Sequence, residues 1–419
     1  MAGKTIKAIL LGAGLRGNVY CNYALTNPEE LKIVGVAEPD KTRLESFAGK
    51  HNIPGSDCFS TWEDVFTRDK WADAVFICTQ DNMHYGPAMA AISQGYDILL
   101  EKPISPDPAE CIKIAEAAEA KGVKVIVCHV LRYTPFFAKI KEIIESGEIG
   151  KVVTVVHNEN VGDLHHSHSF VRGNWASAKT SSPMILAKSC HDLDILQWLV
   201  DKKCIKLSSF GSLSYFTSSN SPEGAPDRCT DGCTVNCPYD SRKLYIGGEN
   251  EWFRSAAAGH ENATNEQIEA ALKSGPYGRC VFNCGNDVVD HQVVSMEFED
   301  GVTAAFSMSS FTPEISRSIK VMGTKGQIKG HSEPNSIKVF DFGTRTEREI
   351  LLNADGGHGG GDIGIMEAFC AYLSGTYTGS ALSEAKISAK NHMLCFAAEK
   401  SRLDGGGVVE VQTYVGSMK

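Results

Sequence analysis

The sequence predicts an α/β protein with two parts: an N-terminal parallel sheet covered by helices, and a C-terminal α/β domain with a large, mostly antiparallel, open sheet. In the first 130 residues, short continuous apolar runs alternate with helix-like stretches, which is typical of a parallel sheet buried on both faces. Beyond residue 130 the runs become longer and alternate between apolar and polar residues, as in antiparallel strands with one exposed face. A chain of 419 residues is long enough for more than one domain.

The expected elements follow these patterns along the chain. N-terminal strands are expected at residues 6–11, 32–37, 73–78, 97–100 and 123–129, with helices at 18–25 and 109–120. C-terminal strands are expected at residues 152–158, 205–216, 293–298, 303–309, 319–322, 336–342 and 408–414, with helices at 265–273 and 384–402. The expected domains are residues 1–130 and 131–419, and the second contains a Cys-, Gly- and Asn-rich insertion at about 217–290.

Composition excludes several classes of partner. The formal net charge is -10, which is unfavourable for binding a nucleic-acid backbone, so we expect no nucleic-acid partner. No run approaches the roughly 18 apolar residues of a membrane span, so we expect no membrane partner. The apolar N-terminal stretch is short and leads directly into a glycine motif that needs it as a strand, so it is not interpreted as a signal peptide and a cytoplasmic location is expected.

A glycine motif follows the first strand. Gly12, Gly14 and Gly17 have the G-x-G-x-x-G spacing between a strand and a helix, which is the fingerprint of a dinucleotide-binding Rossmann domain. The first glycine allows a tight turn, the second lets the backbone approach a pyrophosphate, and the third allows the helix to pack closely on the strand. Leu15 and Arg16, between these glycines, are also expected to contact the cofactor.

The second strand ends in a carboxylate that indicates which dinucleotide binds. Glu38 lies about 20 residues beyond the last glycine, where an acidic side chain binds the ribose hydroxyls of NAD and repels the 2′-phosphate of NADP. Lys41 and Arg43 lie nearby and could accommodate that phosphate, and Glu38 could also be a solvated strand end. We expect NAD rather than NADP, with Arg43 close to the cofactor.

Further motifs resemble the Gfo/Idh/MocA family of sugar and inositol oxidoreductases over nearly the whole chain. The most specific is Glu101, Lys102 and Pro103 at the end of the fourth strand. The others are the segment from Thr79 through Asn82 to His84, Leu131 to Pro135 with Arg132, Arg172 to Trp175 with Asn174, Lys188 to Asp194 with His191, and His358 to Asp362. The resemblance implies a Rossmann domain followed by a second α/β domain, with nicotinamide and sugar between them.

The resemblance also implies a set of catalytic residues. Lys102 matches the active-site lysine of the family and His191 its histidine acid/base; the alternatives are a surface lysine before a proline and a buried core histidine. Asp194 matches the aspartate that follows this histidine and is expected to orient a ring or a sugar hydroxyl. Many members have an aspartate four residues before the histidine, where this chain has Ala187 followed by Lys188. We expect Lys188 to supply a second positive charge near the substrate oxygen, although it could also be a solvated lysine at a helix start.

The remaining matched residues are expected to bind the two ligands. The cofactor set adds Thr79, Asn82, His84, Glu101, Lys102 and Arg132 to the glycine loop, Glu38 and Arg43. The substrate set is Lys102, Arg172, Asn174, Lys188, His191, His358 and Asp362. His165, His166 and His168 are expected to form a polar loop lining the cleft rather than a metal site, because the nearby carboxylates lack metal-ligand spacing.

Five of the fourteen cysteines lie in the insertion. A structural Zn²⁺ would stabilise a segment with few apolar residues, and its four expected ligands are Cys229, Cys233, Cys237 and Cys280. The alternative is a group of reduced thiols packed around Trp252 and Tyr239. Four thiolates would leave the metal no open position, so no catalytic role is expected for it.

The expected function is an NAD-dependent dehydrogenase that acts on a secondary hydroxyl of a sugar, glycoside or cyclitol, with oxidation at the 3-position. One alternative is a glycoside-cleaving enzyme that oxidises and re-reduces its substrate with tightly bound NAD. Another is a non-catalytic NAD-binding regulator, which would have no need of Lys102 and His191. The large open sheet and the resemblance lead us to expect a homodimer or homotetramer.

Overall fold

The computed structural model describes residues 4–353 and 356–418. Its first sheet has six parallel strands in the order β3-β2-β1-β4-β5-β6. This is the strand order of a Rossmann domain, and the fold class that the sequence predicts is confirmed. The strands are β1 (Ile6–Leu11), β2 (Leu31–Ala37), β3 (Cys58–Phe59), β4 (Ala74–Ile77), β5 (Asp97–Leu100) and β6 (Val125–Val127).

The N-terminal helices begin and end where local sequence signals place them. In α6, Asp107 caps the first turn by accepting a hydrogen bond from the N–H of Ala109, Pro108 occupies the first turn, and Gly122 ends the helix in the left-handed conformation. The helices of this part are α1 (Leu15–Cys21), α2 (Tyr23–Thr26), α3 (Lys41–His51), α4 (Trp62–Val65), α5 (Tyr85–Gln94) and α6 (Pro108–Lys121).

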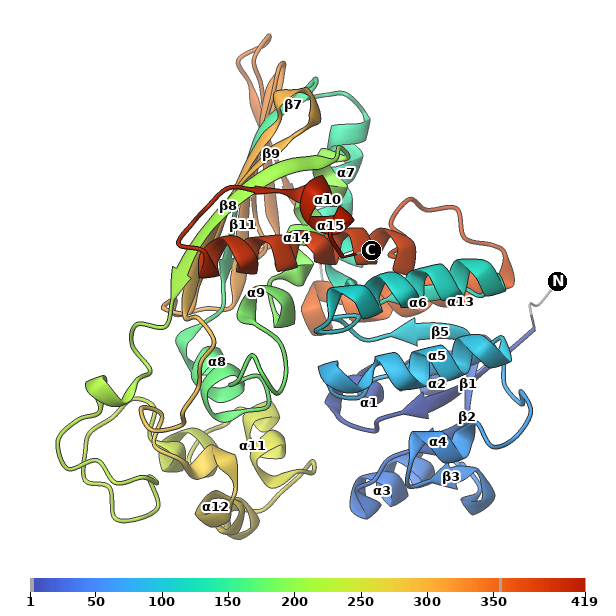
Figure 1. Cartoon of the computed structure of the whole chain (residues 1–419), viewed down its shortest axis with the longest axis vertical. Helices are drawn as coiled ribbons and strands as arrows, with labels where there is room; N and C mark the ends of the chain where they lie inside the picture. The colour runs from blue at the N-terminus through green and yellow to red at the C-terminus, as the bar shows by residue number, and fades with distance from the viewer. Residues whose placement is uncertain (1–3, 354–355, 419) are drawn as a thin grey trace.

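The second sheet has nine strands in the order β14-β13-β12-β11-β7-β10-β9-β8-β15, and only the pair β7 and β10 is parallel. Figure 1 shows this sheet at the upper left and the first sheet at the lower right. Its strands are β7 (Val152–Asn160), β8 (Cys204–Ser212), β9 (His291–Phe298), β10 (Thr303–Ser309), β11 (Ser316–Gly323), β12 (Gly326–His331), β13 (Ser336–Asp341), β14 (Glu347–Leu351) and β15 (Val409–Glu410). The sequence analysis did not identify β3, β12 or β14.

Helices connect and flank the second sheet. They are α7 (Pro135–Glu145), α8 (Asp163–His166), α9 (Met184–Ala187), α10 (Cys190–Val200), α11 (Glu251–Ala258), α12 (Asn265–Ser274), α13 (Gly361–Ser374), α14 (Ala385–Leu403) and α15 (Val411–Gly416). The helices expected at 265–273 and 384–402 are therefore present. Within the described residues, no helix has both the length and the apolar character needed to cross a bilayer.

The prediction of a strand at residues 408–414 is wrong. Only Val409 and Glu410 pair with β8, and the chain then turns into α15. Val411, Tyr414 and Val415 all pack against the main core. Their spacing places them on one face of a helix, so a helix buries these apolar side chains on one side.

One C-terminal helix covers the N-terminal sheet. Although α13 lies in the expected second domain, its residues Ile365 and Phe369 pack in the same core as Leu10 and Phe76 of the first sheet. The rings of Phe76 and Phe369 are 5.5 Å apart and nearly perpendicular. The chain therefore returns to the Rossmann part after β14 and adds the last strand of the second sheet, β15, only afterwards.

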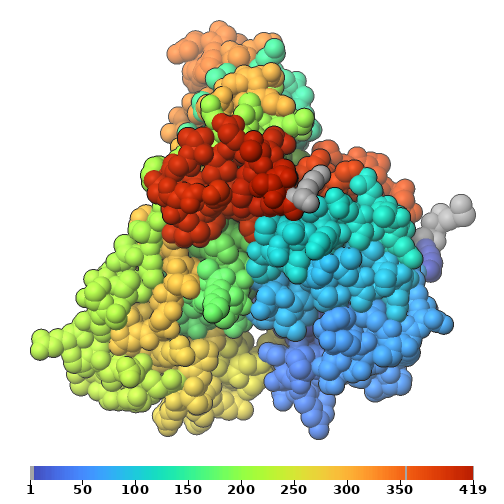
Figure 2. Space-filling model, in the orientation of Figure 1, coloured from blue at the N-terminus to red at the C-terminus, as the bar shows by residue number. Residues whose placement is uncertain are grey.

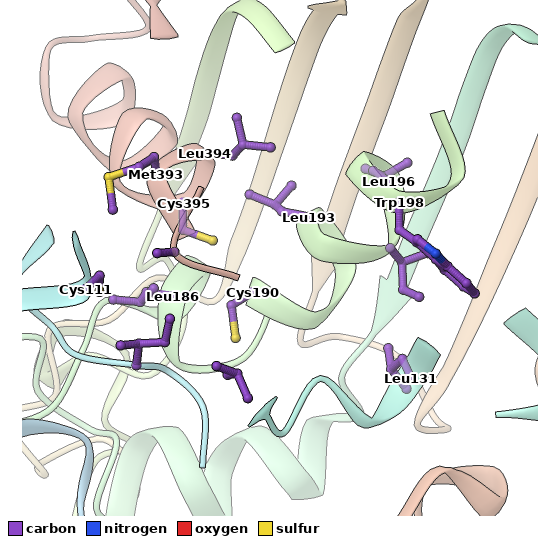
Figure 3. Packing of buried hydrophobic residues seen from close by; sticks show 14 of the residues in the cluster. Cys111, Leu131, Leu186, Cys190, Leu193, Leu196, Trp198, Met393, Leu394 and Cys395 are labelled. Atoms are coloured by element: carbon purple, nitrogen blue, oxygen red, sulfur yellow. The ribbon is translucent and has the colours of Figure 1, made fainter. Parts of the chain in front are cut away.

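Helices α10 and α14 pack together between the two parts. Their apolar contact joins Cys190 and Leu193 of α10 to Leu394 and Cys395 of α14 (Figure 3). This cluster is continuous with the core of the first sheet, to which Ile98 contributes. The start of α10 is therefore fixed relative to the ends of β4 and β5.

Candidate active site

The glycine loop between β1 and α1 has the geometry that its spacing predicts. Gly12 has φ +91°, and a Cβ there would lie 2.6 Å from the carbonyl oxygen of Cys78. A Cβ at Gly17 would overlap the carbonyl oxygen of Gly12. At Gly14, no atom of the described chain lies within 4 Å of the position a Cβ would take. The backbone at Gly14 is thus open to a ligand, and Leu15 beside it is exposed.

Glu38 lies against this loop. Its carboxylate accepts a hydrogen bond from the N–H of Ala13 at 2.8 Å and another from the N–H of Asp40 at 3.0 Å. The Arg43 guanidinium donates to the same carboxylate at 2.8 Å. Glu38 is only 3% exposed, so these contacts hold its charge at the carboxyl end of β2. That is the place where a Rossmann domain binds a ribose.

Arg16 joins the Rossmann part to the C-terminal part. Its guanidinium binds Glu101 at 2.9 Å and Asp362, on α13, at 2.6 Å. Tyr20 donates a further hydrogen bond to Glu101. Arg16 is expected to contact the cofactor and Asp362 the substrate, but the structure pairs them with each other. Burial alone would raise the pKa of Glu101, yet Arg16 and Lys102 hold it below its ordinary value.

The glycine-rich segment before α13 brings His358 to the same region. His358 Nδ1 lies 3.1 Å from the Asp362 carboxylate, and its ring is 6.2 Å from the ring of His191. Burial lowers the pKa of His358, although Asp362 opposes the decrease. His358 is therefore placed near the expected catalytic histidine.

Lys102 and the start of α10 meet between the two parts of the molecule. Lys102 lies just after β5, at the carboxyl edge of the parallel sheet. Its ammonium group donates a hydrogen bond to the carbonyl oxygen of Ala187 at 2.9 Å. Ala187 ends α9, four residues before His191, so the contact brings Lys102 to the segment that carries both Lys188 and His191.

His191 is 3% exposed and sits among other histidines and cations. Its ring is 5.8 Å from the ring of His129, and its Nδ1 has no hydrogen-bond partner among the described residues. Burial lowers the pKa of His191 well below its ordinary value, and the nearby ammonium of Lys102 lowers it further. The imidazole is consequently neutral at neutral pH.

Asp194, expected to orient a ring or a sugar hydroxyl, lies 3.9 Å from His129 Nδ1 and forms a buried ion pair. Its carboxylate binds the Arg132 guanidinium through two hydrogen bonds, at 2.6 and 2.8 Å, and accepts another from Asn391 at 2.7 Å. Burial alone would raise the pKa of Asp194, but Arg132 holds it below its ordinary value. Both residues are buried, so Arg132, expected at the cofactor, instead ties α10 to the start of the second part.

Lys188 is the second lysine of the site. Its side chain is 13% exposed, and its ammonium lies 3.9 Å from the carboxylate of Glu159. Burial lowers the pKa of Lys188 to about 8. This places its charge change close to neutral pH, where few lysines titrate.

The loop after β4 is tied to the strand that carries Lys102. The ring nitrogens of His84 lie 2.7 Å from the carbonyl oxygen of Pro103 and 3.1 Å from that of Thr79. The Thr79 hydroxyl donates to the carbonyl of Met83, while Asn82 is exposed. His84 is buried and links the two loops, so Asn82 is the side chain of this expected cofactor set that remains open to a ligand.

Two family models match the chain. Residues 6–129 match the oxidoreductase family with an NAD-binding Rossmann fold, and residues 137–329 match the GFO/IDH/MocA C-terminal domain. The chain belongs to the Gfo/Idh/MocA oxidoreductase family. It is 26% identical over 365 residues to a Bacillus subtilis protein named as an oxidoreductase, YteT, which covers 80% of this chain and 81% of that one. It is 25% identical over 245 residues to inositol 2-dehydrogenase of Salmonella typhimurium, which covers 56% of this chain and 69% of that one.

Solved structures share the fold along almost the whole chain. Levoglucosan dehydrogenase, in complex with NADH and levoglucosan, aligns with a TM-score of 0.72 at 16% identity, over 97% of this chain and 99% of that one. An inositol dehydrogenase homologue from Azotobacter vinelandii, in complex with NAD⁺, aligns with a TM-score of 0.71 at 14% identity, over 97% of each chain. Both share the two-part α/β fold of this chain.

The expected substrate residues Arg172 and Asn174 differ in burial and in contacts. Arg172 is buried, and its guanidinium donates to the backbone carbonyls of Arg279 at 2.8 Å and Tyr239 at 2.7 Å. These carbonyls belong to the insertion, so Arg172 anchors the insertion rather than facing solvent. Asn174 is exposed and remains a predicted substrate residue.

Two of the three histidines in the expected histidine loop of this Gfo/Idh/MocA protein are buried. His166 bonds with the Ser310 hydroxyl at 2.7 Å, and His168 bonds with the Tyr245 hydroxyl at 3.0 Å. Both histidines are buried, and burial lowers the pKa of each, to about 4 for His166 and about 3 for His168. Only His165 of the three is partly exposed.

The structure does not support the expected zinc site. The insertion lies beside the N-terminal part in Figure 2, and its four expected ligands Cys229, Cys233, Cys237 and Cys280 line one small cavity. Across residues 4–353 and 356–418, however, no group of three or more His, Cys, Asp or Glu side chains is arranged to hold a metal ion. All fourteen cysteines are free thiols. Cys280 packs in one apolar cluster with Tyr239, whereas Trp252 belongs to a separate one.

Sequence reasoning missed Asp81, which joins the two parts beside the site. Its buried carboxylate accepts hydrogen bonds from the indole N–H of Trp175 at 3.1 Å and from the hydroxyls of Ser181 at 3.1 Å and Ser182 at 2.9 Å. Asp81 lies inside a motif segment used for the family resemblance, but its partners are about 100 residues away. Only the fold could identify them.

Proposed function

We propose that this oxidoreductase is an NAD-dependent dehydrogenase acting on a secondary hydroxyl of a sugar, glycoside or cyclitol. The observation that carries the proposal is the meeting of Lys102 with the segment that holds Lys188 and His191, at the carboxyl edge of the Rossmann sheet. Ligands of open parallel sheets bind at this edge. The relatives named as inositol 2-dehydrogenase and levoglucosan dehydrogenase support a small polyhydroxylated substrate.

The residues at the glycine loop fit a nicotinamide dinucleotide. The backbone at Gly14 is open, which suits a pyrophosphate, and Glu38 presents a fixed carboxylate that suits ribose hydroxyls. Glu38 already neutralises Arg43, so this guanidinium is less able to bind a 2′-phosphate, which favours NAD over NADP. When bound, the nicotinamide supplies hydride chemistry to the substrate carbon. The cytoplasm is the proposed location.

The proposed roles of the protein residues follow from their contacts and charges. Lys102 donates a hydrogen bond to the substrate oxygen and holds it in place. His191 is neutral because of its depressed pKa, so it accepts the hydroxyl proton during oxidation. Lys188 adds positive charge that stabilises negative charge developing on the same oxygen. Oxidation at the 3-position is our proposal for the site of reaction.

The test measures NADH absorbance with purified protein, NAD⁺ and a panel of sugars, glycosides and inositols, with NADP⁺ in parallel. We expect NADH formation with one group of substrates, and loss of this activity in Lys102→Ala and His191→Ala variants that still bind NAD⁺. Products oxidised only at another carbon would contradict the 3-position. Release of an aglycone without net NADH would replace the proposal by the redox-neutral glycoside-cleaving alternative.

We also propose that the outer face of the second sheet pairs with a second copy of the chain. Val156, Phe210 and Val293 lie on strands of this sheet and are exposed. Burying them would remove apolar surface from water. Sedimentation equilibrium should give twice or four times the chain mass, and Phe210→Asp with Val293→Asp should yield monomers. A monomeric wild-type protein would contradict this assembly.

A further inference from the structure

A buried ion-pair network lies beneath the segment that carries Lys188 and His191. It contains Glu159 of β7, Arg317 of β11 and Asp192 of α10. Arg317 donates to the Glu159 carboxylate at 2.6 Å and to Asp192 at 2.7 and 3.1 Å. Glu159 and Asp192 are at most 1% exposed. The two carboxylates share one guanidinium, which fixes β7, β11 and α10 to one another.

The two carboxylates differ in their remaining partners. Asp192 also accepts a hydrogen bond from His157 Nε2 at 2.7 Å. Glu159 instead binds the segment above it, because it accepts a hydrogen bond from the Ser189 hydroxyl at 2.7 Å and lies 3.9 Å from the Lys188 ammonium. Burial raises the pKa of Glu159 and Asp192 raises it further, while Arg317 opposes both. The net result is a raised pKa, and the Arg317 guanidinium at 2.6 Å and the Lys188 ammonium at 3.9 Å are the contacts that favour the charged carboxylate.

The surroundings of Lys188 are otherwise cationic or neutral. Besides Glu159 and Asp192, the charged groups that act on the Lys188 ammonium are Arg317 of β11 and Lys102 after β5. Lys188 in turn lowers the pKa values of two histidines, His165 of α8 and His358 before α13. Burial and the two cations all favour the neutral amine. Glu159 is therefore the main charge that favours the ammonium form.

We propose that Glu159 is a positioning residue of the reaction: its carboxylate, held by Arg317 and Ser189, keeps Lys188 charged and in place beside Lys102 and His191. This inference rests on the proposed function. Many family members have an aspartate where this chain has Ala187, and Glu159 keeps the neighbouring Lys188 charged at the substrate oxygen. Ser189 acts on Lys188 through Glu159, whereas Arg317 holds Glu159 in place and also repels the Lys188 ammonium directly.

The direct test measures the protonation of Lys188 without substrate or cofactor. Purified protein is labelled with trace acetic anhydride over a range of pH, and acetylation of Lys188 is quantified by peptide mass spectrometry. We expect a midpoint near 8 in the wild type. In Glu159→Gln the midpoint should fall by about 1 to 3, because an opposite charge within 4 to 6 Å has been removed. An unchanged midpoint would overturn the proposal.

Matched variants make the result specific. Glu297→Gln removes a carboxylate from β9 that pairs with the exposed Lys206, and it should leave the Lys188 midpoint unchanged. Lys102→Gln removes a cation and should raise the midpoint. Glu159→Asp retracts the charge by one methylene and should give a smaller fall than Gln. If Glu159→Gln does not fold, Glu159→Asp decides the matter, since an unaltered midpoint in that variant also refutes the proposal.

A second readout uses the substrate found with the panel. Activity should fall as pH rises through the pKa of Lys188, because the ammonium form is lost. A decrease of 1 in that pKa reduces the charged fraction at pH 8 from about one half to about one tenth, so kcat should fall about fivefold in Glu159→Gln, with NAD⁺ affinity unchanged. A pH limb at the wild-type position would contradict the inference. Failure of the whole panel would count against the proposed function alone, because the labelling result needs no turnover.

Discussion

Replacing Arg16 by methionine removes a cation that joins the glycine loop to Glu101 and to Asp362 of α13. Methionine keeps much of the side-chain volume but leaves the buried carboxylates of Glu101 and Asp362 without their partner at 2.9 and 2.6 Å. Breaking a buried ion pair from one side costs about 3 to 5 kcal/mol. Arg16 is itself 26% exposed, so we expect a loss of about 3 kcal/mol at pH 7.5.

The free energy of unfolding lost in Arg16→Met should become smaller as the pH falls. In the wild type, Arg16 and Lys102 hold the pKa of Glu101 below its unfolded value, and His358 and Arg16 do so for Asp362, although burial opposes both. Their stabilising effect is therefore complete above the unfolded pKa values, near 4, and is lost as pH falls. In Arg16→Met, Glu101 keeps only Lys102 and its Tyr20 hydrogen bond against burial, and Asp362 keeps only His358. Both pKa values rise as a result, and protonation on acidification relieves part of the cost of buried charge. The stability difference between the two proteins should therefore narrow from pH 7.5 to pH 5.

Urea unfolding followed by circular dichroism at the two pH values measures this difference. Arg348→Met is the matched control, because Arg348 pairs with the exposed Glu148 and such surface pairs contribute about 0 to 1 kcal/mol. A loss below about 1 kcal/mol for Arg16→Met would refute the reasoning, since it would equal that of a surface pair. A difference that stays constant or widens at pH 5 would show that buried charge is not its cause.

Three further predictions concern the cofactor, the returning helix and the insertion. Gly14→Val should weaken NAD⁺ binding at least about tenfold in calorimetry, because the added side chain occupies the open space next to the backbone. The unfolding midpoint should stay unchanged, and normal NAD⁺ affinity would show that the cofactor does not bind there. Phe369→Ala should cost about 3 to 5 kcal/mol in urea unfolding because the ring is fully buried against Phe76, and a loss under about 1 kcal/mol would contradict the packing of α13. Arg172→Met should leave two backbone carbonyls of the insertion without a donor, which lowers the free energy of unfolding by about 1 to 3 kcal/mol. Tryptic cleavage within residues 217–290 should become faster, and an unchanged rate would mean that other contacts anchor the insertion.

Local patterns in the sequence were sufficient for the Rossmann part. Apolar runs identified β1, β2, β4, β5 and β6, and the spacing of Gly12, Gly14 and Gly17 predicted a turn that the structure reproduces. These features depend on residues close together in the chain, since a strand and the turn after it form one local unit. The same holds for the placement of Lys102 at a strand end.

Partners of buried charges could not be predicted in this way. Arg132 and Arg172 are single cations in motif segments, and the sequence suggested ligand roles for both. The fold pairs Arg132 with Asp194 and gives Arg172 two carbonyls of the insertion. A buried cation must find an acceptor within hydrogen-bond distance, and proximity in space decides which one.

The sequence by itself determined the two-part α/β architecture and the glycine loop, and it proposed the lysines and histidine of the candidate site, because each depends on local patterning or on a short motif. The tertiary structure decided that α13 returns to cover the first sheet, that residues 411–416 form a helix, and that Glu159 and Arg317 lie beneath Lys188. These outcomes depend on which distant apolar faces and charges come together. Which apolar faces and which charges are buried is decided only when the whole core is assembled.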